Sequence, residues 1–171
     1  MTETAQQYIQ RITAYVEGKE PLTIQAATAR VLAQLTGAVP AATLRTRPAP
    51  EKWSPAEIIA HLADAEIVTA YRLRWVLGAP GSAIAAYDQE AWATSGHYRA
   101  RDPRQCVEQF RCVREANLAL LESLTREQWQ LYGVHSERGR ETIEQTVRMT
   151  AGHDLGHVQQ IRHILRPPEV G

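Results

Sequence analysis

Helix start signals constrain the fold of this chain more than any other feature of its sequence. The clearest is SPAE at residues 54–57, a capping box with proline at the first helical position, where the missing N–H costs no hydrogen bond. Further capping boxes begin at Thr4 and Thr142. Apolar residues follow each box at steps of three and four, whereas the alternation typical of strands is weak. The chain is therefore expected to be all-α.

Glycine and proline mark where each helical pattern ends, which places the helices along the chain. The predicted helices cover residues 4–18, 21–37, 54–77, 102–124 and 142–165, with short ones near 88–93 and from 125. The predicted connections are residues 40–50, 81–101 and 131–139, the last with room for a little extended structure. There is no internal repeat and no linker, so residues 1–171 are expected to form a single domain.

The charge and hydropathy of the chain exclude several classes of partner. Nineteen basic and nineteen acidic residues cancel, and no basic tract would attract a phosphate backbone, so no nucleic-acid partner is expected. No apolar run approaches the ~20 residues that cross a bilayer, and the first residues lack the basic and apolar regions of a secretory signal. Cys106 and Cys112 lie six apart in one predicted helix and make a poor disulfide pair. We expect a cytoplasmic protein without a membrane partner.

Three histidines are placed where two helices could share a metal ion. His153 and His157 lie four residues apart on the last predicted helix, so they project as neighbours. At 100° per residue they lie roughly 100° and 60° from the centre of the apolar stripe, and His61 lies roughly 80° from the stripe of its own helix. Three imidazoles leave room for water or substrate on the ion. The alternative is three partly buried histidines that pair with backbone or carboxylate groups, and the residue pattern alone leaves both interpretations open.

The residues next to the histidine pair indicate close packing and a buried charge. Gly152 and Gly156 stand in mid-helix, where glycine costs about 1 kcal/mol relative to alanine, so a neighbour is expected to pack tightly there. Asp154 falls near the middle of the apolar stripe, where a carboxylate needs a partner. It either accepts a hydrogen bond from a metal-binding imidazole or pairs with a long arginine such as Arg72. The sequence does not choose between these partners.

The other polar candidates have simpler explanations. His163 lies on the polar side of the last helix and is expected to be solvated. His97 and His135 fall in irregular segments, although His135 could approach a pocket at the end of the bundle. Glu57 is one turn before His61 but is explained by its capping box. Asp64 is expected to form a salt bridge.

Sequence motifs do not settle whether the site is catalytic. G-x-S-x-G, P-loop and G-x-G-x-x-G motifs are missing, and HDLGH at residues 153–157 lacks the glutamate of the H-E-x-x-H metalloprotease helix. The catalytic residues are therefore unknown. One hypothesis is a metal-dependent enzyme, and the other is a non-catalytic metal- or ligand-binding bundle with a stress-related or regulatory role. The lack of an obvious acid or base beside the histidines slightly favours the second.

Two segments carry a family resemblance, namely WSPAEIIAHLADAE at residues 53–66 and HDLGHVQQI at residues 153–161, with a further likeness in YDQEAW at 87–92. On these segments the chain resembles the DinB-like superfamily, which includes the DinB/YfiT-like metalloenzymes. The resemblance spans about residues 21–165.

This resemblance implies a four-helix bundle with a core at about 21–165, an extra N-terminal helix, and a homodimeric assembly. It also implies one divalent ion, zinc or nickel, bound by His61, His153 and His157. Related proteins include thiol S-transferases and isomerases that use bacillithiol or mycothiol. The resemblance therefore implies a metal-dependent transferase or hydrolase, with a low-molecular-weight thiol as a candidate cofactor and a small molecule as substrate.

Overall fold

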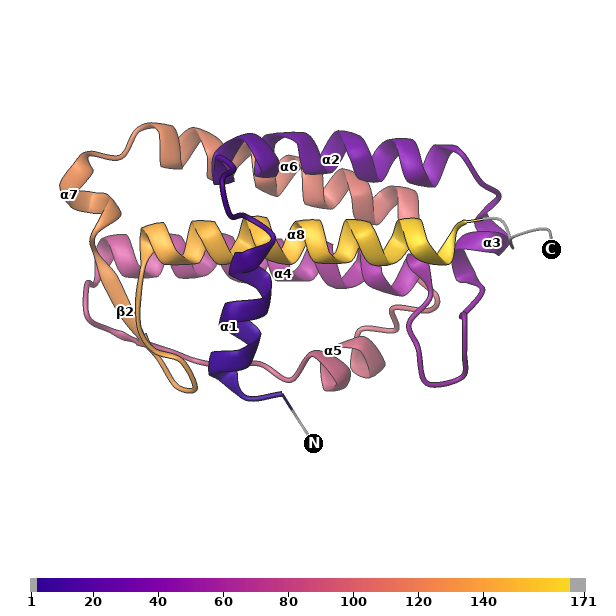
Figure 1. Ribbon diagram of the computed structural model, residues 1–171, viewed down its shortest axis with the longest axis horizontal. Helices are drawn as coiled ribbons and strands as arrows, with labels where there is room; N and C mark the ends of the chain where they lie inside the picture. The colour runs from indigo at the N-terminus through magenta and orange to yellow at the C-terminus, as the bar shows by residue number, and fades with distance from the viewer. Residues whose placement is uncertain (1–2, 167–171) are drawn as a thin grey trace.

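The computed structural model describes residues 3–166 and confirms a helical bundle with a short sheet at one end. Its helices are α1 (Ala5–Ala14), α2 (Pro21–Gly37), α3 (Ala41–Arg45), α4 (Pro55–Gly78), α5 (Gln89–Ser95), α6 (Pro103–Glu122), α7 (Arg126–Trp129) and α8 (Ile143–Ile164). Its strands are β1 (Ala83–Ile84), β2 (Tyr132–His135) and β3 (Gly139–Thr142). The four long helices α2, α4, α6 and α8 lie alongside one another, and α1 crosses over α8 (Figure 1). The expected four-helix bundle with an extra N-terminal helix is thus present.

The predicted capping boxes start their helices. At the head of α4, the Ser54 hydroxyl accepts a hydrogen bond from the Glu57 amide at 3.3 Å, and the Glu57 carboxylate accepts one from the Ser54 amide at 2.9 Å. Thr4 and Thr142 form the same reciprocal pair of bonds at α1 and α8, and a fourth box at Thr125 starts α7. Caps of this kind typically stabilise a helix by ~1 kcal/mol, so local sequence alone fixes where these helices begin.

The core holds α4 and α8 side by side. α4 packs on α6 and α8, while α2 packs on α6 and α8 from the other side. One buried cluster lies where these four helices meet, and its large apolar members include Leu32, Ile58, Ile59, Leu62, Phe110, Val158 and Ile161. A second cluster lies toward the sheet and includes Leu73, Val76, Ile84, Leu121, Ile143 and Val147. The contact of α4 with α8 places the two histidine-bearing helices next to each other.

Residues 131–139, expected to be a connection with room for a little extended structure, contribute to a three-stranded sheet. Strands β2 and β3 form an antiparallel hairpin with Tyr132 opposite Thr142, and β1 pairs with β2 in parallel, with Ala83 opposite Val134. Gly139 has a φ of 74° in the hairpin turn, a conformation that favours glycine. The sheet covers one end of the bundle.

Two smaller expectations concern the cysteines and the membrane. Both cysteines are free, Cys106 buried and Cys112 exposed, in agreement with the predicted absence of a disulfide. Within residues 3–166 no helix combines the length and the apolar character needed to span a membrane.

Candidate metal centre

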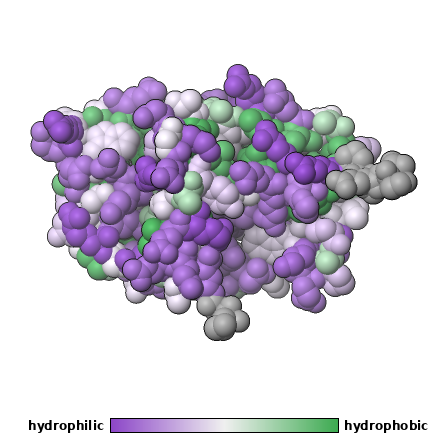
Figure 2. Space-filling view, viewed as in Figure 1, coloured by the Kyte–Doolittle hydropathy of each residue, from purple (hydrophilic) through white to green (hydrophobic). Residues whose placement is uncertain are grey.

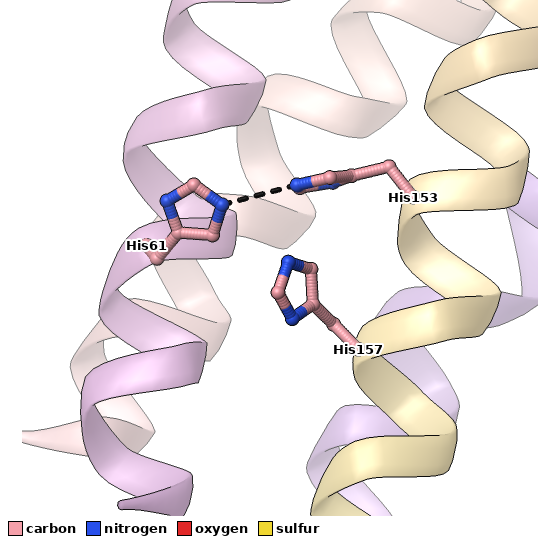
Figure 3. A group of neighbouring side chains, drawn as sticks. All are labelled: His61, His153 and His157. Carbon is pink, nitrogen blue, oxygen red and sulfur yellow. Dashed lines mark hydrogen bonds between the residues drawn. The ribbon is translucent and has the colours of Figure 1, made fainter. Parts of the chain in front are cut away.

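The three predicted histidines converge between two helices. His61 projects from α4, and His153 and His157 project from adjacent turns of α8 (Figure 3). One ring nitrogen from each lies within 4.8 Å of the other two, and the Nε2 atoms of His61 and His153 are 3.0 Å apart. Nitrogens at ~2.0–2.1 Å from a tetrahedral ion would stand roughly 3.4 Å apart. Small side-chain adjustments would therefore let these rings share one ion.

Burial keeps the three imidazoles neutral, which is the protonation state that metal binding needs. His61 is buried, and burial together with His157 lowers its pKa to about 3. Burial likewise lowers the pKa of His153 well below its ordinary value, and lowers the pKa of His157 against the opposing effect of Gln160. The donor set thus fits a divalent cation.

Neighbouring side chains fix the orientation of two rings. The Nδ1 atom of His157 donates to Oε1 of Gln160 at 3.0 Å, which leaves its Nε2 unprotonated. The ring of Trp53 packs against His61 with centroids 5.2 Å apart. A hydrogen bond from the outer nitrogen of a metal-binding histidine is the usual way in which proteins hold such a ring. Gln160 was missed in the sequence because an exposed glutamine near the end of a helix carries no distinctive signal.

Helix α1 is the close neighbour that the two glycines predict. A Cβ atom on Gly152 would overlap the backbone carbonyl of Ile12, and one on Gly156 would stand 3.3 Å from Cε2 of Tyr15. Glycine at these positions therefore lets α1 cross α8 in contact (Figure 1). Residues of α1 line a pocket together with His153 and His157. The extra N-terminal helix forms one wall of the site.

The histidine cluster is open to solvent on the side of α1. A pocket of about 420 Å³ reaches His61 and His153 between the start of α1, the start of α5 and the hairpin. A second pocket of about 390 Å³ reaches His153 and His157 along the other side of α1. Figure 2 shows a hollow in the surface between α1 and α5. A small molecule can therefore approach the ring nitrogens.

The family model described as the DinB superfamily matches residues 24–161. The chain belongs to the DinB superfamily. Among solved structures, YfiT from Bacillus subtilis, described as a probable metal-dependent hydrolase with an unusual four-helix bundle topology, is 20% identical with a TM-score of 0.79. That likeness covers 95% of this DinB protein and 88% of YfiT.

A mycothiol-dependent maleylpyruvate isomerase also shares the fold, with 12% identity and a TM-score of 0.67 over 82% of this chain and 59% of the isomerase. At such identities the two likenesses establish the fold alone. No sequence among the curated proteins matches this chain significantly.

Asp154 of this DinB protein pairs with an arginine, but with Arg114 and not with Arg72. Oδ2 of Asp154 lies 2.6 Å from Nη1 of Arg114, and Oδ1 lies 3.2 Å from Nη2. Arg114 also donates to Glu66 at 2.7 Å, and all three side chains are buried. The sequence left open whether Asp154 pairs with a metal-binding imidazole or with an arginine. In the structure its partner is an arginine, which comes from α6. The charge of Asp154 still acts on the site, since it opposes the lowering of the His157 pKa.

Arg114 is a second neighbour of the site that sequence reasoning missed. It lies four residues after Phe110, over whose ring its guanidinium carbon sits at 4.5 Å from the centroid. Its bonds to Glu66 on α4 and Asp154 on α8 tie together the two helices that carry the histidines. The available signal was one charged residue on the apolar stripe of each of three helices, namely Glu66, Arg114 and Asp154.

Except for His135, which was expected in an irregular segment, the remaining polar candidates lie where the sequence predicted. Glu57 completes its capping box and also pairs with Arg47, away from the histidine nitrogens. Asp64 accepts from Arg101 at 2.8 Å. His163 and His97 are exposed, whereas His135 is buried in β2.

Proposed function

We propose that this DinB protein is a metal-dependent enzyme in which His61, His153 and His157 bind one divalent ion. The observation that carries the proposal is the convergence of three neutral imidazoles beside an open pocket. Three protein ligands and an accessible fourth position are typical of catalytic sites, whereas structural zinc sites have four protein ligands. Imidazole ligands suit several transition metals, and zinc or nickel is the proposed occupant.

A divalent ion held there would supply Lewis acidity, lowering the pKa of a water or thiol at its open position. The protein residues around the pocket would orient the substrate. Tyr8 and Tyr87 both line the pocket that reaches His61 and His153. Burial raises the pKa of Tyr87 to about 12 and also raises that of Tyr8, so both phenols are hydrogen-bond donors at neutral pH. They would donate to polar groups of a substrate next to the histidines.

Hydrolysis is the first proposed reaction, supported by the likeness to YfiT over nearly the whole chain. Thiol-dependent transfer or isomerisation is the second, supported by the likeness to the mycothiol-dependent isomerase. The cytoplasmic location and the homodimer stay predictions.

The test is turnover of a panel of esters, amides and electrophiles by zinc- and nickel-loaded protein, with and without bacillithiol or mycothiol. Metal-dependent turnover that is lost in His157→Ala would support an enzyme, and thiol dependence would select the second reaction. One bound ion without turnover of any compound would favour the non-catalytic metal-binding bundle.

A further inference from the structure

Arg72 lines a cavity that also reaches the histidine cluster. It follows His61 by eleven residues on α4, which places it on the same helix face and roughly 16 Å further along the axis. It borders a cavity of about 110 Å³ that His153, Tyr8 and Tyr87 also line. The cavity therefore runs from the candidate metal centre toward the sheet end of the bundle.

Among the described residues that line this cavity, Arg72 is the arginine that forms no ion pair. Arg138, on the same cavity, pairs with Glu141 at 2.7 Å. Three carboxylates line the cavity: Glu141 is the partner of Arg138, and Glu66 and Asp154 are both bonded to Arg114. Within residues 3–166 no carboxylate forms an ion pair with Arg72, whose Nη2 donates to the carbonyl oxygen of Ala85 at 2.7 Å. A half-buried cation without an anion is unfavourable unless a ligand supplies the anion.

His135 adds a second donor beside Arg72, behind the residues that line the cavity. Its side chain is buried, and its Nε2 atom lies 3.4 Å from Nη2 of Arg72. Its Nδ1 atom accepts a hydrogen bond from the Glu137 amide at 3.2 Å, so the neutral ring carries its proton on Nε2. Burial, and then the charges of Arg138 and Arg72, lower the His135 pKa and keep the ring neutral. Two N–H donors therefore lie next to each other, and among the described residues only that of Arg72 has an acceptor, the Ala85 carbonyl oxygen.

We propose that Arg72 and His135 form a subsite for a carboxylate group of the substrate, at the end remote from the metal-binding histidines. A guanidinium with a second N–H beside it matches the two oxygens of a carboxylate. The Tyr87 ring, 5.9 Å from the guanidinium carbon, packs beside the charge. This assignment rests on the proposed function for its substrate role, and it names that substrate as an organic acid whose reacting bond lies several bonds from the carboxylate.

The test uses propionate as the probe and its neutral isostere propionamide as the control ligand. Full-length protein freed of metal is titrated, and the imidazole nitrogens of His135 are followed by ¹⁵N NMR. Propionate is expected to shift the His135 Nε2 signal, whereas propionamide is not. Arg72→Gln is expected to weaken propionate binding by about tenfold or more, because a hydrogen bond to a charged group is lost. The matched control is Arg140→Gln, which removes a cation of the sheet that packs over the Tyr132 ring. This variant should bind propionate like the parent.

Further variants test the carboxylate subsite independently of the metal site. The His153→Ala/His157→Ala protein should still bind propionate, and Arg72→Gln in the parent should still bind metal. Arg72→Lys keeps the charge but loses the planar fork of the guanidinium, so it should bind propionate with intermediate affinity. It replaces Arg72→Gln in the test if the glutamine variant does not fold. Equal binding of propionate and propionamide, or unchanged propionate affinity in folded Arg72→Gln, would overturn the subsite. Tighter binding of inorganic phosphate than of propionate would overturn its assignment to carboxylates.

Discussion

Gly152 of α8 lies against Ile12 of α1 so closely that a Cβ atom on residue 152 would overlap the Ile12 carbonyl group. This contact seats the N-terminal helix next to the histidine cluster. It also explains a mid-helix glycine that otherwise destabilises α8 by about 1 kcal/mol relative to alanine.

Gly152→Ala is expected to lower the free energy of unfolding by up to about 2 kcal/mol. Overpacking against backbone costs about 1–3 kcal/mol and outweighs the ~1 kcal/mol gain in helix propensity. Urea unfolding measures the difference. Gly156→Ala is the matched control, because its Cβ would meet only the Tyr15 side chain, which can turn away. A Gly152→Ala protein as stable as Gly156→Ala would refute the close approach of α1.

Arg114→Met is expected to destabilise the protein by about 3–5 kcal/mol. The substitution leaves the Glu66 and Asp154 carboxylates buried without their cation, and an uncompensated buried charge is costly. Chemical unfolding at neutral pH measures the loss. Arg111→Met, which removes an exposed partner of Glu108 and Glu115 on the same helix, is expected to have little effect. Similar losses in the two variants would contradict a buried charge network.

Glu57→Gln is expected to cost about 1–2 kcal/mol at neutral pH, through loss of the charged bond to Arg47. Burial pushes the Glu57 pKa upward, but the bonds from Arg47 and Ser54 outweigh it, so the folded-state pKa is lowered. The contribution of a carboxylate with a lowered pKa is present at neutral pH and is lost as the pH falls through that folded-state value. Unfolding curves from pH 7 to pH 3 should therefore show the two proteins converging in acid. A difference that stays constant with pH would contradict this account.

Gln160→Ala is expected to weaken metal binding about 10- to 100-fold, because His157 loses the hydrogen bond that fixes its orientation and its protonated nitrogen. Competition with a chromogenic chelator measures the affinity. Gln159→Ala, the exposed neighbour on the same helix, is the matched control. Equal affinities of the two variants would show that Gln160 does not support the site.

Local signals made most of the fold predictable. The capping box of Ser54 and Glu57 determines the start of α4 through atoms three residues apart, so the start of that helix can be read without tertiary information. The sheet could not be predicted in this way. Val134 pairs with Arg140 across a short turn, but it also pairs with Ala83, about fifty positions earlier in the chain. Glycines at 133 and 139 make the same segment look like a loop.

The candidate site was predictable where helical spacing alone decides the geometry. His153 and His157 face the same way on any α-helix, and His61 flanks an apolar stripe. The identity of the partners was not predictable, since it depends on contacts between helices. Arginine is rarely buried, so Arg114 gave no signal by itself, and its two carboxylates come from other helices. Arg72, considered as a partner for Asp154, lies against His135 instead.

The most direct test of the central claim is the metal content of protein purified without an affinity tag or chelator. The account predicts about one zinc or nickel ion per chain. The ion should be lost in the His153→Ala/His157→Ala protein and retained in His163→Ala, which changes an exposed histidine on the same helix. A parent protein that contains no metal, and whose melting temperature does not rise with added zinc or nickel, would contradict the account and leave the three histidines as structural residues.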